Sequence, residues 1–163
     1  SNLQPDKYEA AELGVDDVYY VDRDYTIISM PAELEGAVWI MTGNDEKNAT
    51  GPVFISFDVD EAVTVYVGRD QRGDEESEGT PPAWLSDEFE KTDGQIEVTD
   101  GGMGFFTVWS KNFPAGTIEL GGNADAPAAG HGSNYVVAVA PSGKTSVAPG
   151  GKLSTIWGSL KSE

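Results

Sequence analysis

In two neighbouring segments of this chain every second residue is apolar, and this period of two constrains the fold more than any other feature. In residues 53–59 the apolar positions are Val53, Ile55, Phe57 and Val59, and in residues 63–67 they are Val63, Val65 and Val67. A period of two puts every second side chain on the same face of a β-strand. Each segment is therefore expected to be a strand with one buried face. The acidic residues 58–61 between them predict a tight turn and an antiparallel hairpin.

Further short apolar runs follow the same pattern and are separated by Gly, Pro, Asn and Asp. They lie at residues 25–29, 38–41, 105–109, 117–120 and 135–140. Short strands at regular intervals, in a chain of 163 residues with 20 glycines and 9 prolines, are typical of a turn-rich all-β domain. The sequence predicts an antiparallel two-sheet β-sandwich, and periodicity leaves jelly-roll and Greek-key wiring equally open.

The ends of the chain differ in character from its middle. Residues 1–17 are polar and acidic, and we expect an N-terminal extension there, either a short helix or an ordered segment. Residues 18–141 form the predicted sandwich domain. Residues 142–163 predict a Gly- and Pro-containing linker and then a C-terminal strand or tail. That tail either docks back as an edge strand or serves as a peptide for a partner. No segment is as long and apolar as a membrane-spanning helix, so we expect no membrane insertion.

The charge of the chain excludes one class of partner. Asp and Glu number 28 against 10 Lys and Arg, for a formal net charge of −18. A nucleic acid partner is not expected, because neutralising a phosphate backbone requires a basic face. The acids are spread along the chain, which favours a solvated surface suited to a saline, marine or halophilic setting. With no cysteine, the chain has neither disulfides nor a thiolate metal site.

Several motifs, taken in order, resemble a known group of proteins. They are residues 40–47 (IMTGNDEK), 63–67 (VTVYV) with Asp70 and Arg72, 83–85 (AWL), 113–117 (FPAGT), 121–123 (GGN) and 133–137 (SNYVV). Over about residues 25–141 the chain resembles the accessory β-sandwich modules, grouped with the carbohydrate-binding modules, of secreted bacterial polysaccharide-degrading enzymes. The resemblance implies a non-catalytic role outside the cell, in binding sugar or in attachment to a surface. The chain departs from the pattern at residues 68–70 (GRD), where the family carries a small residue and an aromatic before the Asp, so that position lacks a stacking ring.

A long acidic loop at residues 70–93 contains the principal candidate for sugar contact. Trp84 follows two prolines there, and a loop that holds an indole between prolines and charges presents the ring to a ligand or folds it back as a plug at one end of the core. On the first hypothesis Trp84 is a stacking platform. A loop of small residues at 121–134 contains Asn123 and Asn134, whose amides match the hydroxyls of a sugar but equally well cap turns.

Three basic residues complete the predicted site. Arg69, Arg72 and Lys111 are candidates for contacts with the polar groups of a glycan, including a carboxylate or a sulfate. The expected ligand is a polysaccharide or oligosaccharide.

Catalysis is not expected. With this many acids, candidate carboxylate pairs carry no information, and the single histidine, His131, stands between glycines as a surface residue would. No nucleophile elbow, phosphate-binding glycine loop or zinc-binding helix motif occurs. A polysaccharide lyase or hydrolase therefore ranks third, behind a binding module and behind a structural or adhesive spacer without a glycan ligand.

No cofactor is required by this prediction, although hard oxygen ligands leave room for a structural calcium ion. Asn44, Asp45, Asp58 and Asp60 are the candidates, and the alternative is that they are solvated turn residues. The prediction is a carbohydrate-binding module of a secreted, multidomain protein, directed to a polysaccharide of marine or algal origin.

Overall fold

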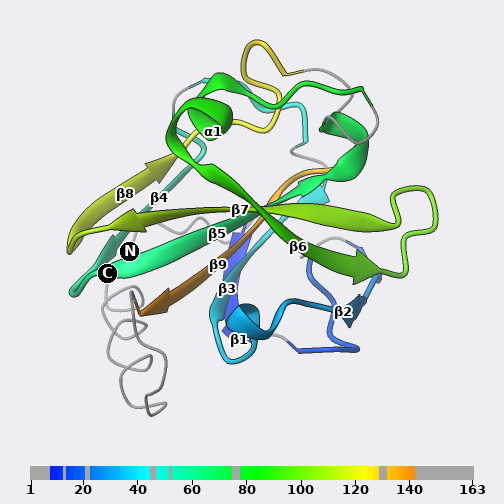
Figure 1. Cartoon of the computed structure of the whole chain (residues 1–163), viewed down its shortest axis with the longest axis horizontal. Helices are drawn as coiled ribbons and strands as arrows, with labels where there is room; N and C mark the ends of the chain where they lie inside the picture. The colour runs from blue at the N-terminus through cyan, green and yellow to red at the C-terminus, as the bar shows by residue number, and fades with distance from the viewer. Residues whose placement is uncertain are drawn as a thin grey trace.

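The chain folds into antiparallel β-structure with very little helix (Figure 1). The computed structural model describes residues 8–12, 14–20, 23–44, 47–51, 53–74, 78–128 and 132–141. The strands are β1 (Tyr8–Glu12), β2 (Ile27–Ser29), β3 (Val38–Thr42), β4 (Ile55–Val59), β5 (Val63–Asp70), β6 (Glu90–Val98), β7 (Phe105–Phe113), β8 (Gly116–Leu120) and β9 (Val136–Pro141). Short helical segments in the described part of the chain are η1 (Ala32–Leu34), η3 (Gln71–Gly73) and α1 (Ala83–Glu88). The predicted all-β, antiparallel class is confirmed.

The strands form two sheets of unequal size. The larger sheet has seven strands in the order β1-β3-β9-β5-β7-β6-β2, and the smaller consists of β4 and β8. Figure 1 shows the larger sheet curling, so that β6 and β2 turn away from the plane of β3, β9 and β5. Both faces of the larger sheet carry apolar side chains, and each face is covered by a separate core.

The first core lies between the smaller sheet and one face of the larger sheet. Ile55, Phe57 and Val59 of β4 meet Val63, Val65 and Val67 of β5 there, and all six are at most 3% exposed. This is the burial that the period of two predicts, because alternate side chains of each strand point to the same side.

The second core lies on the opposite face of the larger sheet. Trp39, Phe106 and Val108 pack there against Tyr19 and Tyr20, which come from the segment before β2. Tyr19 and Phe106 meet edge to face, with ring centroids 5.4 Å apart. The curled sheet and this segment together enclose the second core.

The predicted hairpin between β4 and β5 is wrong. β4 pairs with β8, from Ile55 opposite Leu120 to Val59 opposite Gly116, while β5 pairs with β7 and β9. The connection at residues 60–62 crosses from one sheet to the other. Both strands bury their apolar faces in the first core, but they approach it from opposite sides.

Two stretches contain strands that the sequence pattern did not predict. β6 begins at Glu90, inside the segment expected to be a long loop, and α1 lies in the same segment. β1 pairs with β3, so residues 8–12 are an ordered extension of the larger sheet rather than a short helix. The predicted linker and tail at 142–163 lie outside the described residues. Among the residues that are described, no helix is long and apolar enough to cross a membrane.

Candidate functional site

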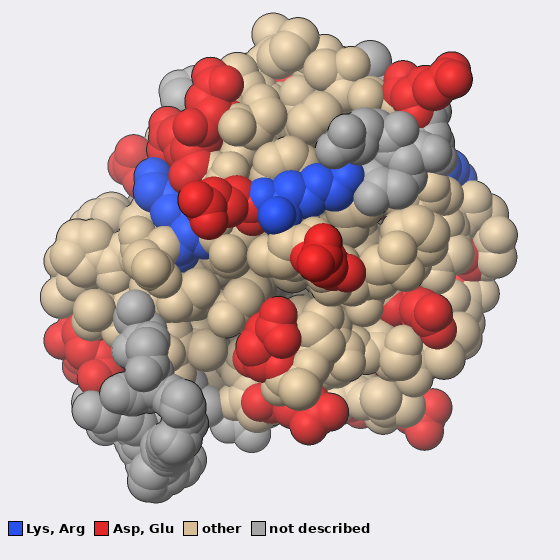
Figure 2. Space-filling model, viewed as in Figure 1, with Lys and Arg blue, Asp and Glu red and all other residues tan. Residues whose placement is uncertain are grey.

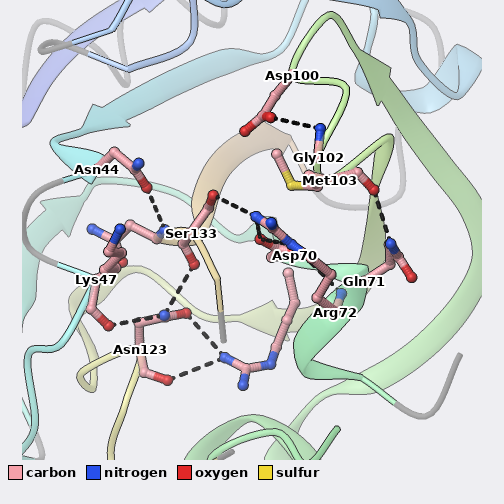
Figure 3. Close-up of polar contacts among 12 residues, drawn as sticks. Asn44, Lys47, Asp70, Gln71, Arg72, Asp100, Gly102, Met103, Asn123 and Ser133 are labelled. Atoms are coloured by element: carbon pink, nitrogen blue, oxygen red, sulfur yellow. Dashed lines mark hydrogen bonds and ion pairs between the residues drawn. The ribbon is translucent and has the colours of Figure 1, made fainter. Parts of the chain in front are cut away.

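One end of the larger sheet gathers loops that are distant in sequence. The end of β5 and η3 meet the 99–104 turn between β6 and β7, the 43–51 loop and the 121–134 loop, and polar side chains join them (Figure 3). This group of loops, called the loop end below, contains most of the predicted site residues.

The last two residues of β5 point to opposite faces of the larger sheet, because side chains alternate along a strand. Arg69 continues the row of Val65 and Val67 toward the first core, while Asp70 lies on the side of the second core. The alternation therefore separates two polar clusters at the loop end, one around Arg69 and one around Arg72.

Arg69 is an interior residue. It is 1% exposed, and its guanidinium donates to the carbonyls of Gly73 (2.9 Å), Thr80 (3.0 Å) and Asn123 (3.1 Å) and to Oδ1 of Asn123 (2.9 Å). Burial lowers the pKa of this guanidinium to about 10, against the opposing effect of the nearby Asp74 and Asp70 carboxylates. Arg69 thus ties three loops together from inside.

The two predicted amides are also interior. Nδ2 of Asn123 donates to the carbonyls of Lys47 (3.0 Å) and Ser133 (3.1 Å), and Nδ2 of Asn134 donates to the carbonyl of Gly43 (2.9 Å). Both side chains are fully buried. In the structure the hydrogen-bonding groups of Arg69, Asn123 and Asn134 fix the loops, and direct contact of these residues with a ligand stays a prediction.

Arg72 lies differently, at the surface of the loop end. Its Nη2 contacts Oδ2 of Asp70 at 2.7 Å, and its Nε and backbone N–H donate to Oδ1 of Asp70 at 3.1 and 2.8 Å. Nη2 also donates to the hydroxyl of Ser133 at 3.2 Å. The side chain of Asp70 is 1% exposed and that of Arg72 is 36% exposed, so a buried carboxylate holds an accessible guanidinium in one orientation. This hydrogen bonding raises the pKa of Arg72.

Two glycines bring backbone close to the Arg72 guanidinium. A Cβ atom on Gly132 would lie 2.5 Å from Cζ of Arg72, so the guanidinium rests directly on the backbone there. A Cβ atom on Gly102 would lie 3.4 Å from Nη1 of Arg72 and 3.5 Å from Oδ1 of Asp100. Gly102 is exposed, and Figure 3 shows Asp100 and Arg72 on either side of it. The guanidinium and the Asp100 carboxylate therefore both lie beside the exposed Gly102, and this position is called the open point below.

A buried tyrosine and a glutamine hold the segments that flank Arg72. The hydroxyl of Tyr20 donates to the carbonyl of Asn134 at 2.6 Å, and burial raises the pKa of this phenol well above its ordinary value. On the other side, Nε2 of Gln71 donates to the carbonyl of Met103 at 2.9 Å, which links η3 to the β6–β7 turn. The position of Arg72 is thus fixed from several directions.

Trp84 is half-buried at the base of α1. Its indole N–H donates to the carbonyl of Gly122 at 2.9 Å, and its ring meets those of Tyr135 and Phe89 edge to face at 5.3 and 6.0 Å. It also packs against the first core. The indole therefore closes one end of the core and meets the 121–134 loop. The stacking platform remains a prediction that these contacts do not support.

Lys111 lies apart from the loop end. It pairs with Val65 in the middle of β5, and its Nζ contacts Oε1 of Glu88 at 2.9 Å and lies 4.8 Å from the ring centroid of Phe113. The structure brings five of the six predicted site residues to one region and leaves Lys111 outside it.

The sequence analysis did not identify Asp100, Gly102 and Ser133 as neighbours of Arg72. Asp100 and two glycines form the turn between β6 and β7, and an Asp-Gly pair between alternating segments is a strong hairpin signal. The Asp-Gly pair was present in the sequence, but it indicates a hairpin only if the segment before it is recognised as the strand β6.

Two of the candidate calcium ligands, Asn44 and Asp58, lie in different parts of the structure. Oδ1 of Asn44 accepts from the backbone of Asn134 at 2.9 Å, and Oδ1 of Asp58 accepts from the hydroxyl of Thr117 at 2.6 Å on the outer side of the smaller sheet. Within the described ranges, no group of three or more His, Cys, Asp and Glu residues is placed to hold a metal ion. Asp45 and His131 lie outside the described residues.

Comparison with known proteins adds a likeness of fold. No protein-family model and no curated protein sequence matches the chain. A solved structure, that of a beta-glucuronidase from glycoside hydrolase family 2, is similar over 87% of this chain with a TM-score of 0.73 and 19% sequence identity. The matched part is 14% of that enzyme's chain, so this chain corresponds in length to a small part of it. At this identity the likeness concerns the fold alone.

Proposed function

We propose that this chain is a non-catalytic glycan-binding domain of a larger carbohydrate-active protein, and that the exposed face of the loop end around Arg72 contacts the glycan. The observation that carries the proposal is the accessible Arg72 guanidinium, held by the buried Asp70 carboxylate between Gly102 and Gly132. A donor fixed in advance loses little conformational entropy when it binds hydroxyl oxygens.

The comparison supports the setting of this function. The chain shares the fold of a segment of a glycoside hydrolase family 2 beta-glucuronidase, of which it covers 14%. A domain of this size beside catalytic domains is consistent with a targeting role. In the same proposal, the two sheets that enclose the first core constitute a β-sandwich, modified by the curl of the larger sheet.

The surface charge supports the rest of the setting. Figure 2 shows acidic side chains spread over one face and basic side chains confined to a narrow band, in keeping with the net charge of −18. We propose that the protein is secreted into saline surroundings, binds a polysaccharide of marine or algal origin rather than nucleic acid, and requires no cofactor.

The second candidate function is a structural spacer without a ligand. It is favoured by the fact that Trp84, Arg69, Asn123 and Asn134 all make contacts that serve the fold. On this alternative Arg72 only joins η3 to the 133–135 segment.

Affinity gel electrophoresis separates the two candidates. Native protein is run through gels containing agar, porphyran, alginate, carrageenan, ulvan or fucoidan, beside Arg72→Gln and the surface control Lys111→Gln. We expect at least one polysaccharide to retard the native protein and Lys111→Gln equally, and Arg72→Gln to lose most of the retardation while remaining folded by circular dichroism. No retardation in any gel would favour the spacer. Release of unsaturated or reducing ends from the same polysaccharides would instead indicate an enzyme.

A further inference from the structure

The open point beside Gly102 is bordered by a donor and an acceptor of hydrogen bonds. Nη1 of Arg72 and Oδ1 of Asp100 are the two atoms found within 4 Å of a Cβ placed on Gly102, apart from the chain neighbours of that glycine. Within the part of the chain that the structure describes, Nη1 makes no hydrogen bond, since Asp70 and Ser133 engage Nε and Nη2. Oδ1 of Asp100 accepts from the backbone N–H of Gly102 at 3.1 Å and, as a carboxylate oxygen, can accept another bond.

A donor and an acceptor on either side of one point match two neighbouring hydroxyl groups. A hydroxyl both donates and accepts, so one hydroxyl of a vicinal pair can accept from Arg72 while the next donates to Asp100. Because Gly102 is exposed and has no side chain, nothing on that residue blocks a sugar ring that approaches the two groups from solvent.

The local charge decides between neutral and acidic sugars. Asp70 and Asp100 both lie near Arg72, and their two carboxylates outnumber the single guanidinium. An anionic sugar placed beside Gly102 would approach the Asp100 carboxylate at short range and also meet the negative field of a chain with net charge −18. A neutral glycan meets neither penalty.

We propose that the Arg72–Asp100 pair recognises vicinal hydroxyl groups of a neutral glycan across Gly102, in preference to a uronate or a sulfated sugar. The inference rests on the proposed function and specifies its ligand class. It also replaces the expectation that the arginines select a carboxylate or a sulfate.

Two neighbouring glycines supply a matched pair of variants. In Gly102→Ala the new methyl group occupies the point between Arg72 and Asp100, at ordinary van der Waals distances from both. In Gly101→Ala the methyl group meets nothing within 4 Å. Neither glycine has the positive φ that would strain an alanine, so both variants are expected to fold with similar melting temperatures.

The test measures retention on neutral polysaccharides (galactomannan, laminarin and agarose) and acidic ones (alginate, carrageenan and ulvan). We expect the native protein and Gly101→Ala to bind at least one neutral polysaccharide, Gly102→Ala to bind it at least tenfold more weakly, and Asp100→Asn to bind it more weakly while tolerating acidic polysaccharides better. If Gly102→Ala melts at a lower temperature than Gly101→Ala, the binding of Asp100→Asn to neutral and acidic polysaccharides is the measurement that tests the proposal.

The outcomes distinguish this inference from the proposed function. Native protein that binds an acidic polysaccharide more tightly than every neutral one would overturn the ligand class and leave the glycan-binding function standing. Neutral binding that is equal in Gly101→Ala, Gly102→Ala and Asp100→Asn would place the ligand elsewhere on the domain. Absence of binding to all six polysaccharides would overturn both.

Discussion

Arg69 and Arg72 are three residues apart, and the structure uses them in opposite ways. Arg69 is buried and donates to three backbone carbonyls, whereas Arg72 is held by one buried carboxylate and keeps one side open to solvent. The difference follows from where the two side chains lie. Arg69 points from β5 toward the first core, whereas Arg72 lies in η3 and pairs with Asp70 on the other side of the larger sheet. The comparison teaches that a basic residue beside a predicted site indicates binding only if the fold leaves part of its hydrogen-bonding capacity unused.

The largest expected effect concerns the interior member of this comparison. Arg69→Met would leave carbonyl groups of Gly73, Thr80 and Asn123 without their donor, and would remove one of the positive charges near the Asp70 and Asp74 carboxylates. We expect the free energy of unfolding to fall by about 3–5 kcal/mol, the usual cost of removing one member of a buried charged group. Urea denaturation followed by tryptophan fluorescence measures it.

Arg72→Gln is the matched control for that variant. The Arg72 side chain is 36% exposed, so solvent screens its pairing with Asp70, and a loss of about 1 kcal/mol is expected. Equal losses in the two variants would show that burial does not separate the two arginines energetically.

The next effect tests the role of Trp84, which packs against the first core. Trp84→Phe removes the donor to the carbonyl of the buried Gly122 but keeps an aromatic ring against Tyr135 and Phe89. We expect the free energy of unfolding to fall by about 1–2 kcal/mol, because the carbonyl loses its partner. Glycan retention should remain unchanged if the ring closes the core. A selective loss of retention at native stability would instead support the stacking platform.

Sequence reasoning predicted faces of strands better than it predicted their partners. The period of two in residues 63–67 correctly placed Val63, Val65 and Val67 in the core. The same pattern could not show that β4 and β5 belong to different sheets, since pairing depends on contacts with β8, β7 and β9. β6 was missed because most of its side chains are polar and only Ile96 and Val98 are buried, which gives too short an apolar alternation.

The candidate site shows the same division. Sequence alone selected two of the segments that meet, residues 70–93 and 121–134, because glycines, asparagines and prolines mark them. It could not show that Asn123 and Asn134 are buried, since amides bond equally well to sugars and to the carbonyls of neighbouring loops. The exposure of Arg72 depends on Gly102 and Gly132, which are 30 or more positions away in sequence.

A smaller effect on the free energy of unfolding, of opposite sign, is expected at Tyr19, which lies in the second core. Among the residues that the structure describes, its buried hydroxyl has no hydrogen-bond partner, and burial together with the Asp100 carboxylate raises the pKa of the phenol. Tyr19→Phe removes an unsatisfied polar atom, so we expect the free energy of unfolding to rise by about 1 kcal/mol at neutral pH.

The pH dependence of this variant follows from the same shift. A raised folded-state pKa means that the Tyr19 contribution to stability is complete below about pH 10, the ordinary pKa of tyrosine, and is lost as the pH rises toward the folded-state value. Tyr19→Phe should therefore lose less stability than the native protein in urea titrations between pH 9 and pH 11. The lowered pKa of Arg69 acts with the opposite sign, but it is common to both proteins. Parallel curves would contradict the assigned burial of the Tyr19 phenol.

The smallest effect is expected at Lys111, the predicted site residue that lies outside the loop end. Its contact with Glu88 is solvent-exposed, and exposed ion pairs of this kind contribute about 0–1 kcal/mol. Lys111→Gln should change the free energy of unfolding by less than about 0.5 kcal/mol and leave polysaccharide retention intact, as measured by urea denaturation and affinity electrophoresis. Because Lys111→Gln and Arg72→Gln remove the same charge, loss of retention in both would mean that net charge governs binding, and the distinction between a positioned guanidinium and a surface cation would fail.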